Sequence, residues 1–234
     1  MIADRLQAFD WRAVTEALDA GGTALLPGLL SATDCERLRA LHDDADRFRS
    51  RVVMARHGFG SGEYRYFRYP LPETVAALRA AIYPRLAGLA NEWQARMGGI
   101  ADFPDTHDAY RARCHAAGQT RPTPLLLRYR ENDYNCLHQD LYGAHCFPLQ
   151  VIVQLSEPGT DFTGGELVVT EQRPRMQSRA EVLPLSRGDA AVLAVSQRPR
   201  RGRRGDHRVT MRHGVSRVRS GERMALGIIF HDAA

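Results

Sequence analysis

Lysine is absent from this sequence, although its 234 residues include 32 basic side chains, all of them arginine. An enzyme that forms a Schiff base through a lysine amine is therefore excluded, as is a P-loop nucleotide site. Genome composition is the simplest cause of the arginine bias. Arginine is thus the one permanently charged cation that the side chains of this protein can offer to an anionic ligand.

Cysteine is scarce, and its spacing is uninformative. The four cysteines contain no CxxC pair, so we expect neither a disulfide framework nor a structural zinc site. Cys136 lies two positions before His138, and a metal site that combines the two is an alternative, but no second closely spaced pair supports it. The sequence favours free thiols at Cys35, Cys114, Cys136 and Cys146.

Long hydrophobic runs are also missing. No apolar stretch approaches the roughly 20 residues that a membrane span needs. The first residues, MIADRLQAFDWRAV, carry acid where a signal peptide would carry a basic flank and an apolar segment. We therefore expect a cytoplasmic protein without a membrane partner, whose residues 1–234 form a single domain, because 44% hydrophobic and 25% charged residues are typical of a globular chain.

Residues 1–123 have the pattern of a mainly helical support region. DWRAVTEALDAGG has helical apolar spacing and ends on two glycines, and Ser31 to Asp34 offer cap residues for a helix over CERLRALHDDADRF. HDAYRARCHAAG predicts another helix. PETVAALRAAIYPRLAGLANEWQARMG predicts two helices that meet at Pro84, since proline interrupts helices. TALLPGLL and EYRYFRYP are the strand-like exceptions.

Residues 124–234 consist of short β-type runs separated by turn residues. Strands are expected near LLLRY, CLHQDL, FPLQVIVQL, GELVVTE, AEVLPL, AAVLAVS, HRVTMRHGVSRV and RMALGIIF. Short strands at this spacing favour a closed or double-sheet architecture, with the jelly roll as the leading candidate. The predicted fold class is α+β: a jelly-roll catalytic core over 124–234, with the N-terminal helices packed against it.

The segment NCLHQDL places an imidazole and a carboxylate two positions apart. On a strand, His138 and Asp140 project from the same face, because side chains alternate. A facial metal site takes a third ligand, which we expect to be another histidine. His213 heads a distant strand-like run that a barrel can bring back beside the pair. Spacing alone leaves several downstream histidines as candidates, namely His145, His207, His213 and His231.

The order of four segments resembles the Fe(II)/2-oxoglutarate-dependent dioxygenases, and most closely their prolyl-hydroxylase-like branch. These segments are RYRENDYNCLHQD, FTGGELVVTE, PLSRGDAAVLA and RHGVSRVRSGERMALGIIF, within residues 125–232. The resemblance implies a double-stranded β-helix core, with Fe(II) as cofactor and 2-oxoglutarate and O2 as cosubstrates. It also implies oxidative decarboxylation of 2-oxoglutarate coupled to hydroxylation of a C–H bond.

Carried onto this sequence, the resemblance implies His138, Asp140 and His213 as the iron ligands. It implies Arg223 as the salt-bridge partner of the distal carboxylate of 2-oxoglutarate, and Tyr129 as a hydrogen-bond donor to that carboxylate. The residues leave alternatives open. On an extended strand Arg217 and Arg219 project from the same face as His213, so either can point inward instead of Arg223, which would then be a solvated turn residue. Tyr129 can be an ordinary packing residue of its strand.

The net charge of +5 is concentrated in residues 197–223. We expect an arginine-rich loop over 198–208, at the entrance of the site, to attract phosphate. In EYRYFRYP we expect stacking surfaces from Tyr64, Tyr66, Phe67 and Tyr69, with Tyr66 as the leading candidate. The chain also resembles bacterial members of the superfamily linked to oxidative demethylation of damaged DNA or RNA, which predicts a repair enzyme. The arginines proposed to contact nucleic acid are Arg200, Arg201, Arg203 and Arg204.

Two other functions remain open at this stage. One is hydroxylation of a peptidyl residue, a free amino acid or another small anionic molecule, which the prolyl-hydroxylase-like order of motifs favours. The other is a catalytically silent jelly-roll binding module, against which the intact HxD motif and the distal histidine and arginine argue.

Overall fold

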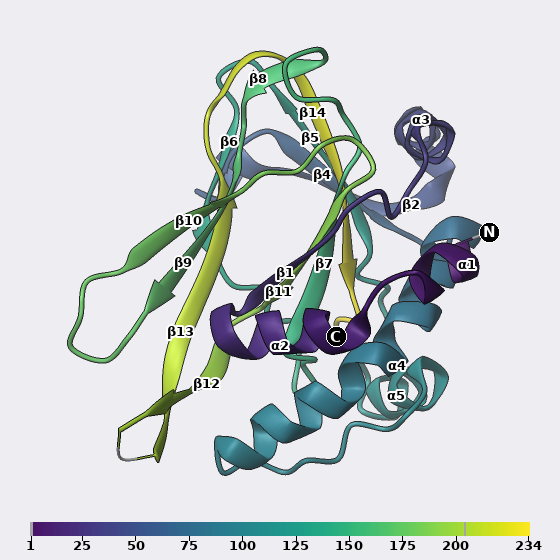
Figure 1. Ribbon diagram of the computed structural model, residues 1–234. Coiled ribbons are helices and arrows are strands. Elements are labelled where there is room, and N and C mark those ends of the chain that lie inside the picture. The colour runs from purple at the N-terminus through teal and green to yellow at the C-terminus, as the bar shows by residue number, and fades with distance from the viewer. Residues whose placement is uncertain (1, 204) are drawn as a thin grey trace.

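The computed structural model describes residues 2–203 and 205–234 (Figure 1). Cap residues fix the helix starts that the sequence predicts, but the helix predicted over CERLRALHDDADRF is wrong at its end, because α3 stops at Ala40 and two 3-10 turns follow before β2. The Asp10 carboxylate accepts from the backbone N–H of Arg12 and Ala13 at the start of α2, and Ser31 and Asp34 form a capping box at the start of α3. The α-helices are α1 Ile2–Gln7, α2 Trp11–Gly21, α3 Ala32–Ala40, α4 Glu73–Arg96 and α5 His107–Ala116, and the 3-10 turns are η1 Leu41–Asp43, η2 Ala45–Arg47 and η3 Met54–Arg56.

Helix α4 is continuous, so the prediction of two helices meeting at Pro84 is wrong. Proline removes one backbone donor and frees the carbonyl of the residue four positions earlier. Both Pro84 and Ala80 are exposed, so that carbonyl faces water and needs no protein partner. The buried face of the helix, including Leu78, Ile82 and Leu86, then holds both halves against the sheet.

Two antiparallel sheets form the body of the protein. The larger runs in the order β1-β11-β7-β14-β5-β4-β2, with β8 paired to β14, and the smaller runs β10-β9-β13-β6-β3, with β12 paired to β13. The larger sheet contains β1 Thr23–Leu26, β2 Phe48–Val53, β4 Glu63–Phe67, β5 Leu125–Arg130, β7 Leu149–Gln154, β8 Phe162–Gly164, β11 Ala190–Ala194 and β14 Val218–Ile229. The smaller contains β3 Gly60–Ser61, β6 Tyr134–His138, β9 Leu167–Gln172, β10 Arg179–Leu183, β12 Gln197–Gly202 and β13 Gly205–Val215.

Strands from both sides of residue 123 share the larger sheet. Strand β1 pairs with β11 at one end, and β4 pairs with β5 toward the other, with β2 beyond it. Strand β2 was not predicted, because FRSRVV is rich in charge and contains only three apolar residues. The N-terminal region therefore supports the jelly roll by extending its larger sheet as well as by supplying helices.

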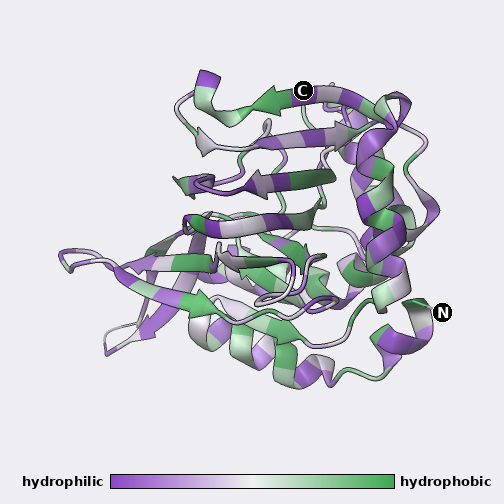
Figure 2. Ribbon diagram, turned by 90° about the horizontal axis from the view of Figure 1, so that it is seen from above, coloured by the Kyte–Doolittle hydropathy of each residue, from purple (hydrophilic) through white to green (hydrophobic). Residues whose placement is uncertain are grey.

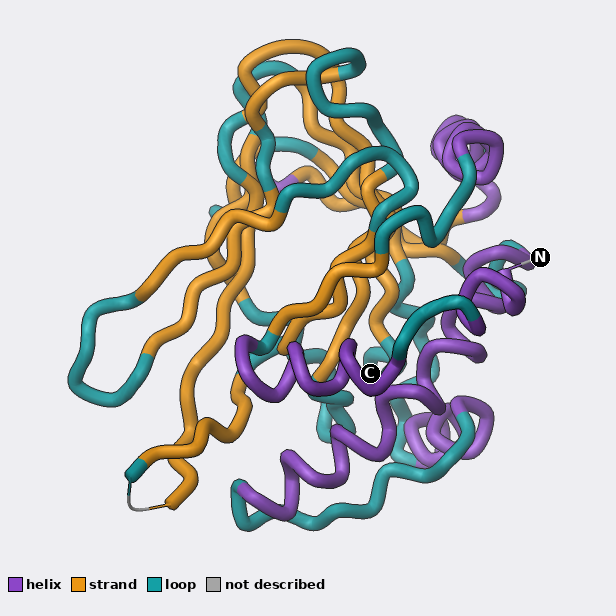
Figure 3. The backbone as a smooth tube through the Cα atoms, in the orientation of Figure 1, coloured by secondary structure: helices purple, strands orange, loops and turns teal. Residues whose placement is uncertain are grey.

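The helices cover the outer face of the larger sheet, and the smaller sheet faces it from the other side (Figures 1 and 3). Figure 2 shows α-helices lying along one side of the stacked strands, with hydrophobic residues on both layers. The main core joins Leu78 and Ile82 of α4 to Leu126 of β5 and Ile228 of β14. The predicted α+β class, with helices packed against a jelly-roll core, is confirmed. Within the described ranges, no helix is long and apolar enough to cross a membrane.

Candidate metal centre and substrate cavity

His138 and His213 lie opposite each other on neighbouring strands. Strand β6 pairs antiparallel with β13, His138 is in register with His213, and the two ring centroids are 4.3 Å apart. Strand β6 ends at His138, so Asp140 lies beyond the strand, but the expected convergence of the two side chains is confirmed, because both belong to one group of potential metal ligands. Residues 139 and 140 belong to no helix or strand, and the Asp140 carboxylate lies beside both imidazoles.

Asp140 completes a compact group of three donors. Its Oδ1 lies 3.6 Å from His138 Nε2 and its Oδ2 lies 3.3 Å from His213 Nε2. One potential ligand atom from each of the three residues lies within 4.8 Å of the others. Burial opposes ionisation of Asp140, but the hydrogen bonds and charges of its histidine and tyrosine neighbours outweigh it, so its pKa is well below the usual value. The carboxylate is therefore an anionic donor.

Hydrogen bonds orient these side chains. The Nδ1–H of His138 donates to the Cys136 carbonyl at 2.8 Å, which leaves the Nε2 lone pair directed at the group. Burial, followed by the nearby His213, lowers the pKa of His138 and favours the neutral imidazole that binds metal. The Tyr142 hydroxyl donates to Asp140 Oδ1 at 2.6 Å, and the Gln150 amide lies 2.9 Å from His213 Nε2. Two imidazoles and one carboxylate on one side of an ion suit Fe(II) and leave positions open for ligands.

The other downstream histidines lie elsewhere. His145 is in the loop before β7, and His207 is on β13 opposite Arg200. His231 is fully buried, and its Nδ1 accepts from the Phe147 backbone N–H. In the described part of the chain the metal-ligating group contains no cysteine, so the alternative that joins Cys136 to His138 receives no support.

Arg223 and Tyr129 face each other across β14 and β5. They are in register, and the guanidinium carbon lies 5.6 Å from the tyrosine ring centroid. Arg223 is only 2% exposed, so the alternative of a solvated turn residue is wrong, whereas Arg217 and Arg219 are exposed. Among the described residues no carboxylate forms an ion pair with Arg223, and its Nε has no hydrogen-bond partner. A buried cation without an acid fits the far carboxylate of a bound dicarboxylate.

A cavity of about 330 Å³ connects these features. Its lining includes the three metal-ligating candidates, Arg223 and Tyr129, and it extends to Tyr66 on β4. Tyr64 and Tyr66, both expected from the sequence to supply stacking surfaces, line the cavity, whereas Phe67 and Tyr69, expected with them, are not among its lining residues. Tyr142, Asn135 and Gln150 also line it and were not predicted.

The arginine-rich segment does not lie at this cavity, and the prediction of a loop over 198–208 at its entrance is wrong. Arg198 and Arg200 belong to β12, which forms a hairpin with β13. Arg200 pairs with His207, six residues before His213, so it lies roughly 20 Å away along the strand. The hairpin points away from the body of the protein (Figure 1).

Ion pairs explain the position of these arginines. Arg198 is fully buried, with its guanidinium against Glu171 and the carbonyls of Asp19 and Ala20. Arg200 Nη1 lies 2.9 Å from the same glutamate. Arg201 and Arg203 are exposed near the hairpin turn, away from the cavity, and Arg204 lies outside the described residues.

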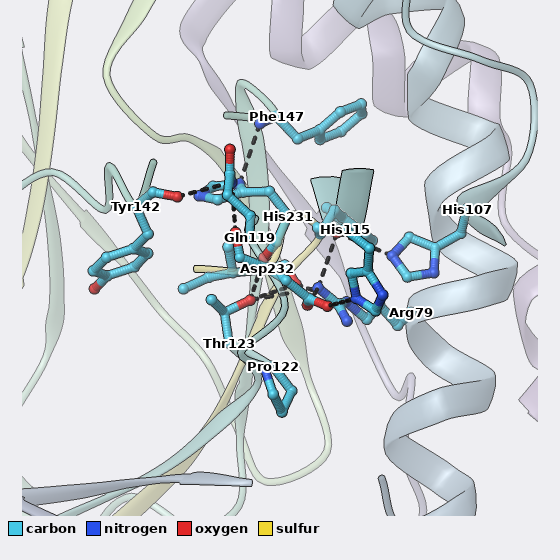
Figure 4. A network of polar contacts seen from close by, with 12 residues as sticks. Arg79, His107, His115, Gln119, Pro122, Thr123, Tyr142, Phe147, His231 and Asp232 are labelled. Atoms are coloured by element: carbon cyan, nitrogen blue, oxygen red, sulfur yellow. Dashed lines mark hydrogen bonds and ion pairs between the residues drawn. The ribbon is translucent and has the colours of Figure 1, made fainter. Parts of the chain in front are cut away.

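A second polar network lies behind the cavity (Figure 4). Arg79 of α4 donates to Asp232 Oδ1 at 2.6 Å and to the carbonyls of Ile229 and Phe230. Gln119 Nε2 donates to the carbonyls of Tyr142 and Asp232, and through these bonds the loop that carries Tyr142 is tied to the end of β14. This network holds the cavity wall from outside.

Comparisons with solved structures agree with the fold. An oxidoreductase of the 2OG-Fe(II) oxygenase family from Burkholderia pseudomallei has a TM-score of 0.54 and 20% identity, covering 97% of this chain and 94% of its own. A prolyl hydroxylase from Trichoplax adhaerens, in complex with a hypoxia inducible factor peptide fragment, has a TM-score of 0.54 and 13% identity, covering 98% of this chain and 90% of its own. These likenesses show the fold, and the His-Asp-His group within it has the donor set of a non-haem Fe(II) site.

Sequence comparisons find relatives with higher identity to the chain than these solved structures have. It is 51% identical over 168 residues to the uncharacterized protein Rv2227 of Mycobacterium tuberculosis (strain ATCC 25618 / H37Rv), covering 72% of each chain. Residues 62–233 match the model of the Oxygenase-NA family, described as an oxygenase catalysing oxidative methylation of damaged DNA. That match spans more than half of the chain and includes every residue of the metal-ligating group, so the protein belongs to the Oxygenase-NA family and is an oxygenase.

Proposed function

We propose that this oxygenase removes methyl groups oxidatively from alkylated DNA or RNA. One observation carries the proposal: a single cavity is lined both by the His-Asp-His group and by Tyr64, Tyr66 and Tyr142. Aromatic side chains beside a metal centre can stack a planar base and hold its methyl group near the oxidant. The description of the family, which names damaged DNA, supports the same substrate class.

In this proposal each residue has a defined role. His138, Asp140 and His213 hold the iron, and Arg223 with Tyr129 holds the distal carboxylate of 2-oxoglutarate. When bound, iron and 2-oxoglutarate supply the oxidation: O2 is consumed, 2-oxoglutarate becomes succinate and CO2, and one oxygen atom enters the methyl C–H bond. The resulting N-hydroxymethyl group leaves as formaldehyde, and the proton of its hydroxyl group returns to the nitrogen.

The chain's own residues govern access and orientation. The three tyrosines exclude water from one side of the base, and the positions of Tyr64 and Tyr66 on β4 are fixed by pairing with β5. Hydrogen bonds from Tyr142 to Asp140 and from His138 to the Cys136 carbonyl keep two metal-ligating groups aligned.

The test follows succinate and formaldehyde together. Fe(II)-loaded protein receives 2-oxoglutarate and air, with a methylated single-stranded oligonucleotide or the same strand unmethylated. We expect the methylated strand to stimulate succinate formation and to release formaldehyde in equal amount. Iron-dependent succinate that is indifferent to the methylated strand would reject demethylation and direct the search to peptides and free amino acids.

A further inference from the structure

We propose that Arg49, stacked on Tyr66, is a phosphate-binding residue for the nucleotide that is oxidised. The inference rests on the proposed function, because it names the group of that substrate which the site recognises. It concerns the opposite end of the cavity from Arg223, in a strand that the sequence did not predict.

A change of register brings Arg49 to the cavity side of the sheet. On β2, Phe48 pairs with Phe67 and Ser50 pairs with Tyr66, so two steps along β2 match one step along β4. Arg49 is the extra residue of this bulge, and a bulge redirects a side chain that regular alternation would send to the other face. Its guanidinium carbon lies 4.4 Å from the centroid of the Tyr66 ring. That ring lines the cavity, and Arg49 packs against it without being a lining residue itself, so the cation lies one side chain away from the cavity.

Arg49 also has no acidic partner among the described residues. Its Nε donates to the Pro122 carbonyl at 2.8 Å, which orients the guanidinium without neutralising it. Its neighbours on the same sheet differ: Arg51, Arg65 and Arg128 all form ion pairs with Glu63. Burial is the main cause that lowers the pKa of Arg49, as expected for a guanidinium held partly out of water without an ion pair. The half-buried cation is therefore free to receive an anion.

The strand register separates this cation from the cosubstrate site. On β5, Tyr129 is in register with Arg223, and Leu125 is in register with Tyr66. These two β5 positions are four residues apart, or about 13 Å along an extended strand. A five-carbon dicarboxylate held at Arg223 does not span that distance. Arg49 consequently serves a different anionic group.

The chemistry of this end of the cavity favours a nucleotide. The Tyr66 ring packs edge-on against Tyr64, with centroids 5.3 Å apart, and against Tyr142, with centroids 6.2 Å apart. Such a wall stacks a planar base, and a guanidinium beside it takes the phosphate of the same nucleotide bidentately. Tyr142 in turn bonds to Asp140, so the base would lie next to the metal centre.

The experiment measures whether a phosphate strengthens binding through Arg49. Protein loaded with Fe(II) and 2-oxoglutarate is kept without oxygen, and its affinity is measured for an N-methylated deoxyadenosine monophosphate and for the matching nucleoside. We expect the wild type to bind the nucleotide about tenfold more tightly, roughly 1.4 kcal/mol. Arg49→Gln should bind the two compounds equally, and Arg49→Lys should keep part of the preference, because it retains a point charge.

Arg51→Gln is the matched control, since Arg51 lies two positions away and is already paired with Glu63. It should keep the wild-type preference and form succinate at the wild-type rate without substrate. A wild type that binds nucleotide and nucleoside equally, or a preference that survives in Arg49→Gln, overturns the assignment. Formaldehyde release is scored separately: a phosphate preference lost in Arg49→Gln without any demethylation supports the phosphate site and rejects the proposed reaction.

Discussion

Arg79 and Arg223 are both almost completely buried, but their surroundings differ. Arg79 donates to Asp232, to two backbone carbonyls and to the Tyr69 hydroxyl, so its charge is neutralised and hydrogen-bonded by groups within the fold. Arg223 faces the Tyr129 ring and the cavity, without an ion pair to any described carboxylate. A buried ion pair that is satisfied contributes to structure, whereas a buried charge that the fold leaves unpaired marks a ligand site.

The largest effect is expected when the metal-ligating group, which lines the same cavity as Arg223, loses its carboxylate. Asp140→Ala removes the only carboxylate of the metal-ligating group found among the described residues. Turnover of 2-oxoglutarate should fall by at least about 1,000-fold, since two histidines alone do not form the facial site. Succinate formation measures this, and an unchanged thermal unfolding midpoint of the metal-free variant excludes misfolding. Turnover within tenfold of wild type would reject the assignment.

The network around Arg79 should respond in stability instead. Asp232→Asn leaves Arg79 buried without its counter-ion and should lower the free energy of unfolding by about 3–5 kcal/mol. Urea denaturation of the metal-free protein measures the loss. Asp44→Asn is the control, because Asp44 forms an ion pair with Arg47 in which both side chains are about half exposed, and its loss should cost under about 1 kcal/mol. If Asp232→Asn and Asp44→Asn lowered the free energy of unfolding equally, the Arg79–Asp232 pair would not have the structural role described above.

The same region should make stability depend on pH. His107 donates to the Phe230 carbonyl at 3.0 Å, and burial, then the charge of Arg79, lowers its pKa to about 4. Because the unfolded value is about 6.5, the folded state binds fewer protons between these values, and stability present above pH 6.5 is lost as the pH falls toward 4. The free energy of unfolding should fall by about 3 kcal/mol over this range, and in His107→Gln it should depend much less on pH. Thermal denaturation of both proteins from pH 7 to 4 measures this, and an equal dependence of stability on pH in the wild type and in His107→Gln would refute the prediction.

Substitution of the two arginines should have opposite consequences. Arg223→Met should raise the half-saturating concentration of 2-oxoglutarate about 100-fold, with stability unchanged or increased, because an unpaired buried charge is removed. Arg79→Met should lower stability and leave the 2-oxoglutarate requirement of the folded fraction unchanged. A 2-oxoglutarate titration with urea denaturation of both variants measures the contrast. An Arg223→Met titration that matches wild type would remove Arg223 as the anchor.

Tyr142 links the two regions and should give the smallest effect. Tyr142→Phe removes the hydrogen bond to Asp140 Oδ1 and should weaken Fe(II) binding about tenfold. Competition with a chelator measures the affinity. Tyr64→Phe changes the same cavity wall without touching Asp140 and should leave Fe(II) affinity as it is. Identical affinities in the two variants would show that the hydrogen bond does not position the carboxylate.

The sequence predicts the local features of this fold and misses those that depend on partners distant along the chain. The strands before and after Asp140 and the cap at Ser31 follow from periodicity and side-chain chemistry. Segment 198–208 does not. Its arginines, proline and glycines favour a loop, but Glu171 on another strand neutralises Arg198 and makes a buried strand favourable.

The candidate site divides in the same way. His138 and Asp140 are predicted by adjacency, and the resemblance selects His213, but no periodicity reports that β6 and β13 are neighbours. Arg49 was missed because its position depends on a bulge, and a one-residue change of register leaves no signal in composition.

Strand β14 carries both the arginine proposed to bind the cosubstrate and backbone groups that stabilise the fold. The strand carries Arg223 near its middle, and the carbonyls of Ile229 and Phe230 at its end bind Arg79. A slip of one residue against β5 would turn Arg223 to the opposite face and offer Arg79 different carbonyls. A misregistered chain would thus lose the arginine proposed to anchor 2-oxoglutarate together with its stability. Under that proposal, a poorly folded molecule could not start the oxidation and so could not damage its surroundings.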